Sequence, residues 1–204
     1  MDIIDDFYGY KYFPKDKDEL KKIIGEHYKN NIFNLNDIDV SEITDFSRLF
    51  YSDKHTSYEN FDISHWDVSN GVNFSEMFHN CQLFNCDLSK WDVSKGETFE
   101  AMFEFCKIFN SDLSKWDVHN CKDFSRMFFD CNEFNSDLSK WNVSNGIRFS
   151  YMFGWCVKFN SDLSKWNVSK GTAFICMFWK CIKFYCKLNK WNINQFANCS
   201  RMFA

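Results

Sequence analysis

A unit of 25 residues that repeats along the chain restricts its fold more than any other feature. Trp recurs at this interval from Trp66 to Trp191, and a Met-Phe pair follows each Trp at a fixed distance. The unit that begins at Leu88 reads LSKWDVSKGETFEAMFEFCKIFNSD. A unit this short cannot bury its own apolar side chains, so the sequence predicts a stack in which each unit packs on its neighbours.

Two apolar patterns occur within each unit. Around Trp91 and Val93, apolar and polar residues alternate, which is typical of a short strand with one buried face. A second pattern has the spacing i, i+3, i+4, i+7 of a short helix and consists of Phe99, Met102, Phe103 and Cys106. We therefore expect an α/β solenoid of about six to seven strand-turn-helix units. In it, Trp91 stacks on Trp116 and Phe99 on Phe124.

The two ends of the chain differ from the regular units. Residues 1–31 lack the repeat and are expected to form an N-terminal cap with a helix at about 16–29, because Asp16 and Glu19 fit a capping box. Residues 32–60 form a degenerate first unit with a three-residue insertion within 51–60, and residues 61–204 are regular. Met202 and Phe203 lie in the last unit without a polar cap after them, so they are a candidate interface for self-association.

The cysteines do not indicate a metal site or a disulfide framework. Half of the ten Cys occupy the last position of the helical pattern, where a small buried apolar residue is expected, and their spacing does not fit zinc. The five His are scattered, and no nucleophile or phosphate-loop motif is present. The sequence therefore predicts buried free thiols and a protein that is not an enzyme, with no catalytic residues, cofactor or metal.

The polar positions beside each Trp form rows on the exposed face of the expected strands. This candidate partner-binding strand face comprises Lys90, Asp92, Lys115, Asp117, Lys140, Asn142, Lys165, Asn167, Lys190 and Asn192. Asn replaces Asp in the later units, so the face becomes more basic toward the C-terminus. Two interpretations stay open, a solvated row and a surface for an acidic protein. Nucleic acid is disfavoured, because the net charge is -4 and the row lacks aromatic residues.

Targeting signals give a further expectation. The first residues are acidic where a secretory signal is basic and then apolar, and no apolar stretch approaches the length of a membrane span. We expect an intracellular protein, cytoplasmic or within a viral particle, with no membrane span.

The pattern FNxDLSxWDVSxxxxFxxMFxxC, together with Leu35 to Ser41 upstream, resembles the BspA-like leucine-rich repeat family, the 25-residue type first noted in mycoplasma lipoproteins. The resemblance covers nearly the whole chain and implies a leucine-rich-repeat-like stack that serves recognition, with no shared catalytic residues. This chain departs from the family pattern in having Gly at 71, 96, 146 and 171, and in lacking the export signal of a surface lipoprotein.

The combined expectation is a non-enzymatic module that binds a protein partner, whose identity the sequence does not give. Two alternatives remain open at this stage. One is a structural or assembly protein, for example a minor component of a large viral particle, and the other is a protein resembling a surface adhesin.

Overall fold

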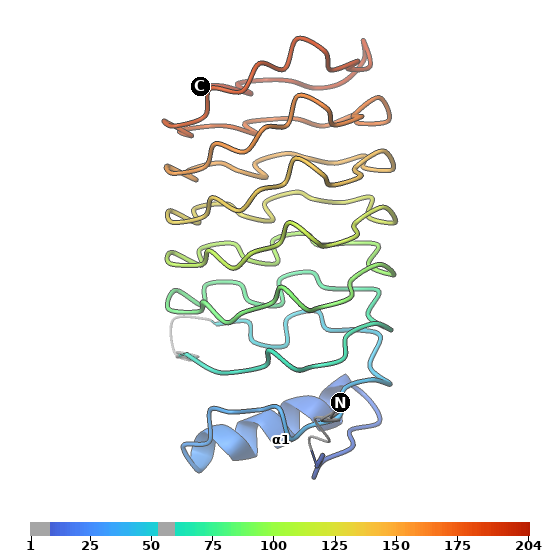
Figure 1. The fold of residues 1–204 in the computed structure, drawn as a ribbon, viewed down its shortest axis with the longest axis vertical. Coiled ribbons are helices and arrows are strands. Elements are labelled where there is room, and N and C mark those ends of the chain that lie inside the picture. Colours follow the sequence, from blue (N-terminus) through green and yellow to red (C-terminus); the bar gives the residue numbers. More distant parts are fainter. Residues whose placement is uncertain (1–8, 53–59) are drawn as a thin grey trace, which may run out of the picture.

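The computed structural model describes residues 9–52 and 60–204 as a stack of layers that is closed at one end by the helix α1, Lys17–Lys29 (Figure 1). The chain winds from α1 to the opposite end, one layer per repeat. Within the described residues no strand forms. Neighbouring segments pair at isolated parallel bridges, which join Tyr12 to Ile38, Asn34 to Asp62, Asp45 to Asn73, Asn73 to Thr98, Thr98 to Asp123, Asp123 to Arg148, Arg148 to Ala173 and Ala173 to Asn198.

The expected α/β solenoid of leucine-rich-repeat type is therefore wrong. Neither the strand expected around Trp91 nor the helix expected around Met102 forms, and the corresponding segments of the other regular units are also turns joined by irregular backbone and isolated bridges. In the described part of the chain α1 is the only helix. The predicted insertion within 51–60 falls mostly outside the described residues.

Two consecutive turns replace each expected helix. The amide of Met102 donates to the carbonyl of Phe99 over 3.1 Å, and that of Cys106 donates to the carbonyl of Phe103 over 3.0 Å. The third residue of each turn, Ala101 or Phe105, has a positive φ of 51° or 65°, as in a type II turn. The apolar residues are the first and last of each turn, so their spacing is the same as that of a helical stripe.

The amides of the first and third residues of these turns bind the next layer. Alternate residues donate to carbonyls of the following layer at 2.8–3.0 Å, and a helix would have used the same amides internally. In one layer the pairs are Phe99 to Asp123, Ala101 to Ser125, Phe103 to Met127 and Phe105 to Phe129.

The expected strand is also a pair of turns. The amide of Trp91 donates to Leu88 over 3.1 Å, and that of Gly96 donates to Val93 over 2.8 Å. Leu88, Trp91 and Val93 still point inward and are buried, because the first and last residues of the turns face the core. The alternation of apolar and polar residues thus predicted burial correctly and the backbone conformation incorrectly.

The predicted stacking of equivalent rings is confirmed. The rings of Trp91 and Trp116 are 6.4 Å apart and nearly parallel, and those of Phe99 and Phe124 are also 6.4 Å apart. Each layer is further bound to the preceding one by side-chain donors. The indole Nε1 of Trp116 donates to the carbonyl of Leu88 over 3.0 Å, and the thiol of Cys131 donates to that of Phe103 over 2.9 Å.

Helix α1 closes the stack where the sequence indicates a cap. Its N-cap residue is Asp16, which accepts from the amide of Glu19 at 2.9 Å. The carboxylate of Glu19 accepts from the amide of Lys15 rather than from that of Asp16. Leu20 and Ile24 are buried and belong to the same core as the stacked rings, so α1 shields the first layer from water.

Candidate interaction surfaces

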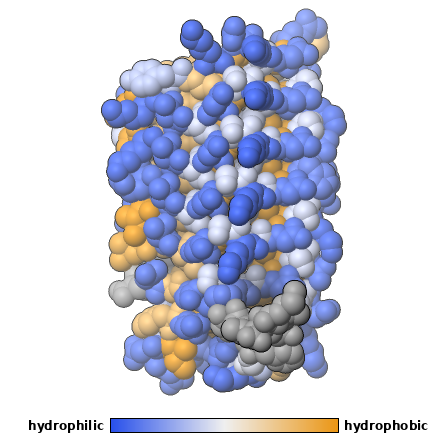
Figure 2. All heavy atoms as spheres, in the orientation of Figure 1, coloured by the Kyte–Doolittle hydropathy of each residue, from blue (hydrophilic) through white to orange (hydrophobic). Residues whose placement is uncertain are grey.

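All ten side chains of the predicted strand face are exposed, although the segment is not a strand. We call the row Lys90, Lys115, Lys140, Lys165 and Lys190, with the Asp and Asn two residues after each, the lysine face. Figure 2 shows that hydrophilic side chains recur from layer to layer along the stack. No ion pair to these five lysines forms within the described residues at salt-bridge distance. Their use in binding is a prediction that the geometry permits.

A second row of acidic side chains, three residues before each of the first four lysines, lies close to the lysine face. Asp87 accepts from the backbone amide of Ser89 at 2.9 Å, and this bond, followed by weaker effects that include the nearby Lys90, lowers the pKa of its carboxyl. The same arrangement recurs at Asp112, Asp137 and Asp162. In the last layer Lys187 replaces this Asp, so Lys190 has a second cation nearby in sequence and the basic character increases there.

The second surface is a row of aromatic side chains that the sequence patterns did not single out. Ring contacts with centroids 4.7–5.9 Å apart run from layer to layer along it, and most are edge-to-face. We call it the aromatic face, and its members are Tyr51, His79, Phe105, Phe129, Tyr151, Trp155 and Trp179. These residues fall outside the apolar stripe, in the variable positions around the two type II turns. The sequence signal that would have identified the aromatic face is the number of large aromatic residues at positions outside the recurring apolar pattern.

Arginine side chains lie over the rings of the aromatic face. The guanidinium of Arg126 is 5.1 Å from the ring centre of Tyr151 and 5.8 Å from that of Phe129. It also donates from Nη1 to a carboxylate oxygen of the buried Glu104 at 2.9 Å, while Nδ1 of His79 lies 3.3 Å from the other oxygen. About half of the Arg126 side chain stays accessible. The guanidinium is thus held in place and still presented to solvent.

The lysine face and the aromatic face lie on opposite walls of the stack. The Trp116 ring, whose neighbours in sequence form the lysine face, contacts Phe99 and Phe103 at 5.9 and 6.3 Å. Phe99 and Phe103 begin the turns that carry the aromatic face. The core rings therefore separate the two surfaces, and a partner could bind either wall without contacting the other.

The predicted end interface is only half exposed. Met202 is 7% exposed and belongs to the core, whereas Phe203 is 62% exposed and stacks on Phe178 at 5.4 Å. Phe196, Tyr185 and Ile182 are also exposed in this part of the stack. Phe203 and Phe196 are therefore large apolar side chains of the last layer that a partner can reach, whereas Met202 is not.

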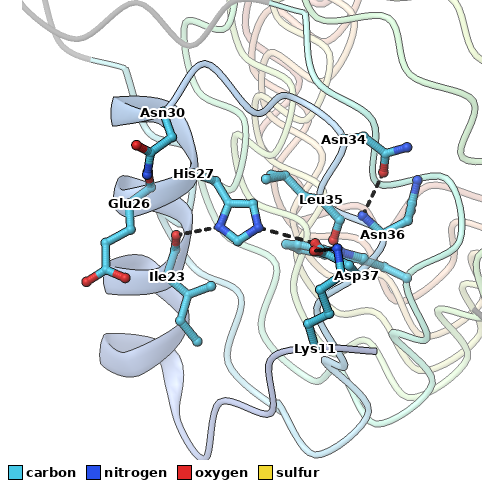
Figure 3. A network of polar contacts seen from close by, with 10 residues as sticks. Lys11, Ile23, Glu26, His27, Asn30, Asn34, Leu35, Asn36 and Asp37 are labelled. Carbon is cyan, nitrogen blue, oxygen red and sulfur yellow. Dashed lines mark hydrogen bonds and ion pairs between the residues drawn. The ribbon is translucent and has the colours of Figure 1, made fainter. Parts of the chain in front are cut away.

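A polar network fastens α1 to the first layer (Figure 3). The ring of the buried His27 lies within hydrogen-bond distance of the Ile23 carbonyl at 2.9 Å and of Asp37 at 3.2 Å. Lys11 reaches the other carboxylate oxygen of Asp37 at 3.3 Å. The cavity beside them measures about 360 Å³. Because these polar groups pair with one another, the network is best explained as a clamp for the cap.

The cysteines are free and mostly buried, as the sequence predicts. Burial raises the pKa of the Cys181 thiol to about 12, and it also raises the pKa values of the equivalent Cys106, Cys131 and Cys156. A thiol with a raised pKa is protonated at neutral pH and is a poor nucleophile and metal ligand. Among the described residues no group of three or more metal-binding side chains converges.

Comparison with family models places the chain in a family. Residues 18–137 and 104–204 each match the model described as "Mycoplasma protein of unknown function, DUF285". The chain belongs to this family. The description carries no function, and the narrower BspA-like assignment stays a prediction.

Comparison with curated proteins and with solved structures finds no significant match. In the part of the chain that the structure describes, no helix is long and apolar enough to cross a membrane. The expected intracellular location stays a prediction.

Proposed function

We propose that this DUF285 chain is a non-enzymatic protein-binding module whose lysine face receives an acidic segment of a partner protein. The observation that supports it is the exposure, in register, of Lys140, Lys165 and Lys190. In these layers Asn142, Asn167 and Asn192 replace the Asp of earlier layers. A row of cations held at fixed spacing by a rigid core attracts a chain of carboxylates.

The test is the binding of a fluorescein-labelled 20-residue peptide of Glu and Asp, followed by fluorescence anisotropy. Replacing Lys140, Lys165 and Lys190 with Glu should weaken binding by about tenfold or more and reduce its dependence on salt, because three attractive charges become repulsive. A matched control reverses three exposed lysines of the cap, Lys15, Lys22 and Lys29. Equal loss in both variants would show that only net charge matters and would contradict the proposal.

A second candidate function, assembly with further copies, is supported by the exposed rings of the last layer. Phe203 and Phe196 are 62% and 86% exposed. Light scattering of the 204-residue chain across concentrations should then show oligomers that Phe196→Glu and Phe203→Glu abolish. Met202 is left unchanged because it is buried. A monomer at every concentration would eliminate this alternative.

A further inference from the structure

We infer that the aromatic face is a second interaction surface, independent of the lysine face, and that it binds an acidic segment of a partner protein that also carries apolar side chains. The centre of this surface is the patch formed by Arg126, Tyr151, Trp155, Trp179, Lys180 and Arg201.

The first argument is the kind of residue that the patch exposes. Trp, Tyr and Arg dominate the binding energy of protein interfaces, because they combine a large apolar area with a polar group. Trp155 is 40% exposed, and Tyr151 and Trp179 are half-buried. The repeat does not require these rings, since the equivalent positions in other layers hold Asn80, Asp130 and Arg126.

The second argument is charge. The chain has a net charge of -4, but this patch is basic. Lys180 and Arg201 have no ion-pair partner among the described residues, and Arg126 shares only one side of its guanidinium with Glu104. A hydrogen bond to the Cys176 thiol raises the pKa of Tyr151, and the charges of Arg126 and Arg201 counteract that rise. Arg126 lies over the Tyr151 ring at 5.1 Å, and Arg201 stands in the same column two layers after Tyr151, so both can meet carboxylates of one extended segment.

The third argument concerns which class of partner fits. Single-stranded nucleic acid binds aromatic residues by stacking bases on free ring faces. Here Trp155 and Trp179 meet at 84° and Phe129 and Tyr151 at 77°, so within each pair one ring covers a face of the other. Such a surface is irregular and suits side chains of mixed shape. A protein segment with carboxylates and apolar groups satisfies both the cations and the rings.

The fourth argument is the rigidity of the patch. The patch is carried by turns whose amides bond to the next layer, as in Tyr151 to Ile175 and Trp155 to Trp179 at 2.8 and 2.7 Å. The rings are thus held in place before binding, which lowers the entropy lost when a partner is captured.

The test is selection from a library of random 12-residue peptides displayed on phage, with the purified full chain as the target. The expected result is enrichment of peptides that combine Asp or Glu with aromatic or aliphatic residues. Their affinity should fall by about tenfold or more in a Trp155→Ala, Trp179→Ala variant, as for residues at the centre of an interface. It should fall also in a Lys180→Glu, Arg201→Glu variant, which removes charge without touching the rings.

The controls separate this surface from the lysine face and from misfolding. The Lys140→Glu, Lys165→Glu, Lys190→Glu variant should bind the selected peptides as the parent chain does. Circular dichroism and thermal unfolding establish that each variant retains the stack. No enrichment, peptides without acidic residues, equal binding by the Trp155→Ala, Trp179→Ala variant, or tighter binding of a 12-nucleotide oligouridine would overturn the inference.

Discussion

The two walls of the stack use the same residue types in opposite ways. On the wall of the lysine face the Trp rings point inward, and Trp141 is 4% exposed and stacks between its neighbours above and below. On the other wall Trp155 is 40% exposed and touches a single Trp edge-to-face. In the interior layers the Trp and Phe residues that keep the 25-residue register are buried, whereas Tyr151, Trp155 and Trp179, which stand in columns without a recurring ring, reach the surface. In these layers the register, rather than hydrophobicity, separates the core from the candidate interface.

The largest expected effect comes from truncating one Trp on each wall. Trp141→Ala should lower the free energy of unfolding by about 3–5 kcal/mol, because it opens a cavity in the core. It also removes the bond from Nε1 to the Leu113 carbonyl, which measures 2.9 Å. Trp155→Ala should change the free energy of unfolding by less than about 1 kcal/mol. Urea unfolding followed by circular dichroism measures both variants.

Similar decreases in the free energy of unfolding for Trp141→Ala and Trp155→Ala would contradict the assignment of one Trp to the core and the other to the surface. Trp141→Phe is an intermediate case, since it keeps a ring and deletes the N–H donor. It should cost about 1–3 kcal/mol, the range for a buried acceptor left without its partner.

Smaller effects are expected from one substitution on each wall, Gly96→Ala on the wall of the lysine face and Lys180→Asn on the wall of the aromatic face. A Cβ added at Gly96 would lie 2.5 Å from Cζ of Phe99 and 3.0 Å from the Val93 carbonyl. Gly96→Ala should therefore lower the free energy of unfolding by about 1–3 kcal/mol through overpacking. On the other wall Lys180 has a φ of 61°, which Asn adopts more readily than Lys. Lys180→Asn should be neutral or stabilising by up to about 1 kcal/mol.

The chain contains its own precedent for both changes. Cys121 stands in the Gly96 position of its layer, and there the Phe99 and Phe124 rings are 6.4 Å apart, against 5.4 Å for Phe124 and Phe149. Asn80 and Asp130 occupy the Lys180 position with φ of 59° and 60°. Thermal unfolding of the two variants, with Lys170→Asn as a surface control, checks the sign of each effect. A stabilising Gly96→Ala would mean that the ring moves without cost.

The smallest effect is a dependence on pH that has opposite sign on the two walls. The amide of Ser114 lowers the pKa of the Asp112 carboxyl, so Asp112 stabilises the fold above the usual Asp range and loses that contribution as pH falls through the lowered pKa. Near the aromatic face, burial followed by the charge of Asp123 raises the pKa of Glu100. Glu100 therefore opposes folding at neutral pH and ceases to do so as the pH falls below its raised pKa.

Unfolding midpoints measured between about pH 3 and pH 7, the range in which carboxyls titrate, separate the two cases. Asp112→Asn should weaken the loss of stability in acid, since Asn keeps the acceptor, as Asn142 does toward Ser144 at 3.2 Å. Glu100→Gln should raise the midpoint at pH 7 slightly. If Asp112→Asn and Glu100→Gln change the pH dependence of the unfolding midpoint in the same direction, the proposed opposite effects of the two carboxyls are wrong.

The sequence predicted which residues contact one another better than it predicted the backbone between them. Stacking of Trp91 on Trp116, burial of the cysteines and the position of α1 follow from periodicity and capping residues, which act locally or repeat identically. Helix and paired type II turns place apolar residues at the same spacing. The choice between them depends on whether the amide of Ala101 bonds within its own layer or to Ser125 in the next, and no local pattern encodes that.

Of the two candidate surfaces, the sequence predicted one and missed the other. The lysine face was predictable because Lys90 and its equivalents recur beside each Trp from Trp91 to Trp191. The charge of Lys90 acts on the carboxyl of Asp87, three residues before it. The carboxyl of Asp92 is instead affected by Lys95. The aromatic face was missed because Trp155 and Trp179 occupy different positions of their units and come together only in the stack.

Each layer donates backbone amides mostly to the layer after it, and it donates indole and thiol hydrogens, with one or two amides such as that of Glu97, to the layer before it. Every interior unit therefore offers and requires the same set of partners. An in-frame duplication or deletion of one unit would leave all of these pairs intact. The reach of the lysine face could thus change in steps of one layer while its chemistry and support stay the same. Gene rearrangement, rather than point mutation, would be the simplest way for such a protein to match partners of different length.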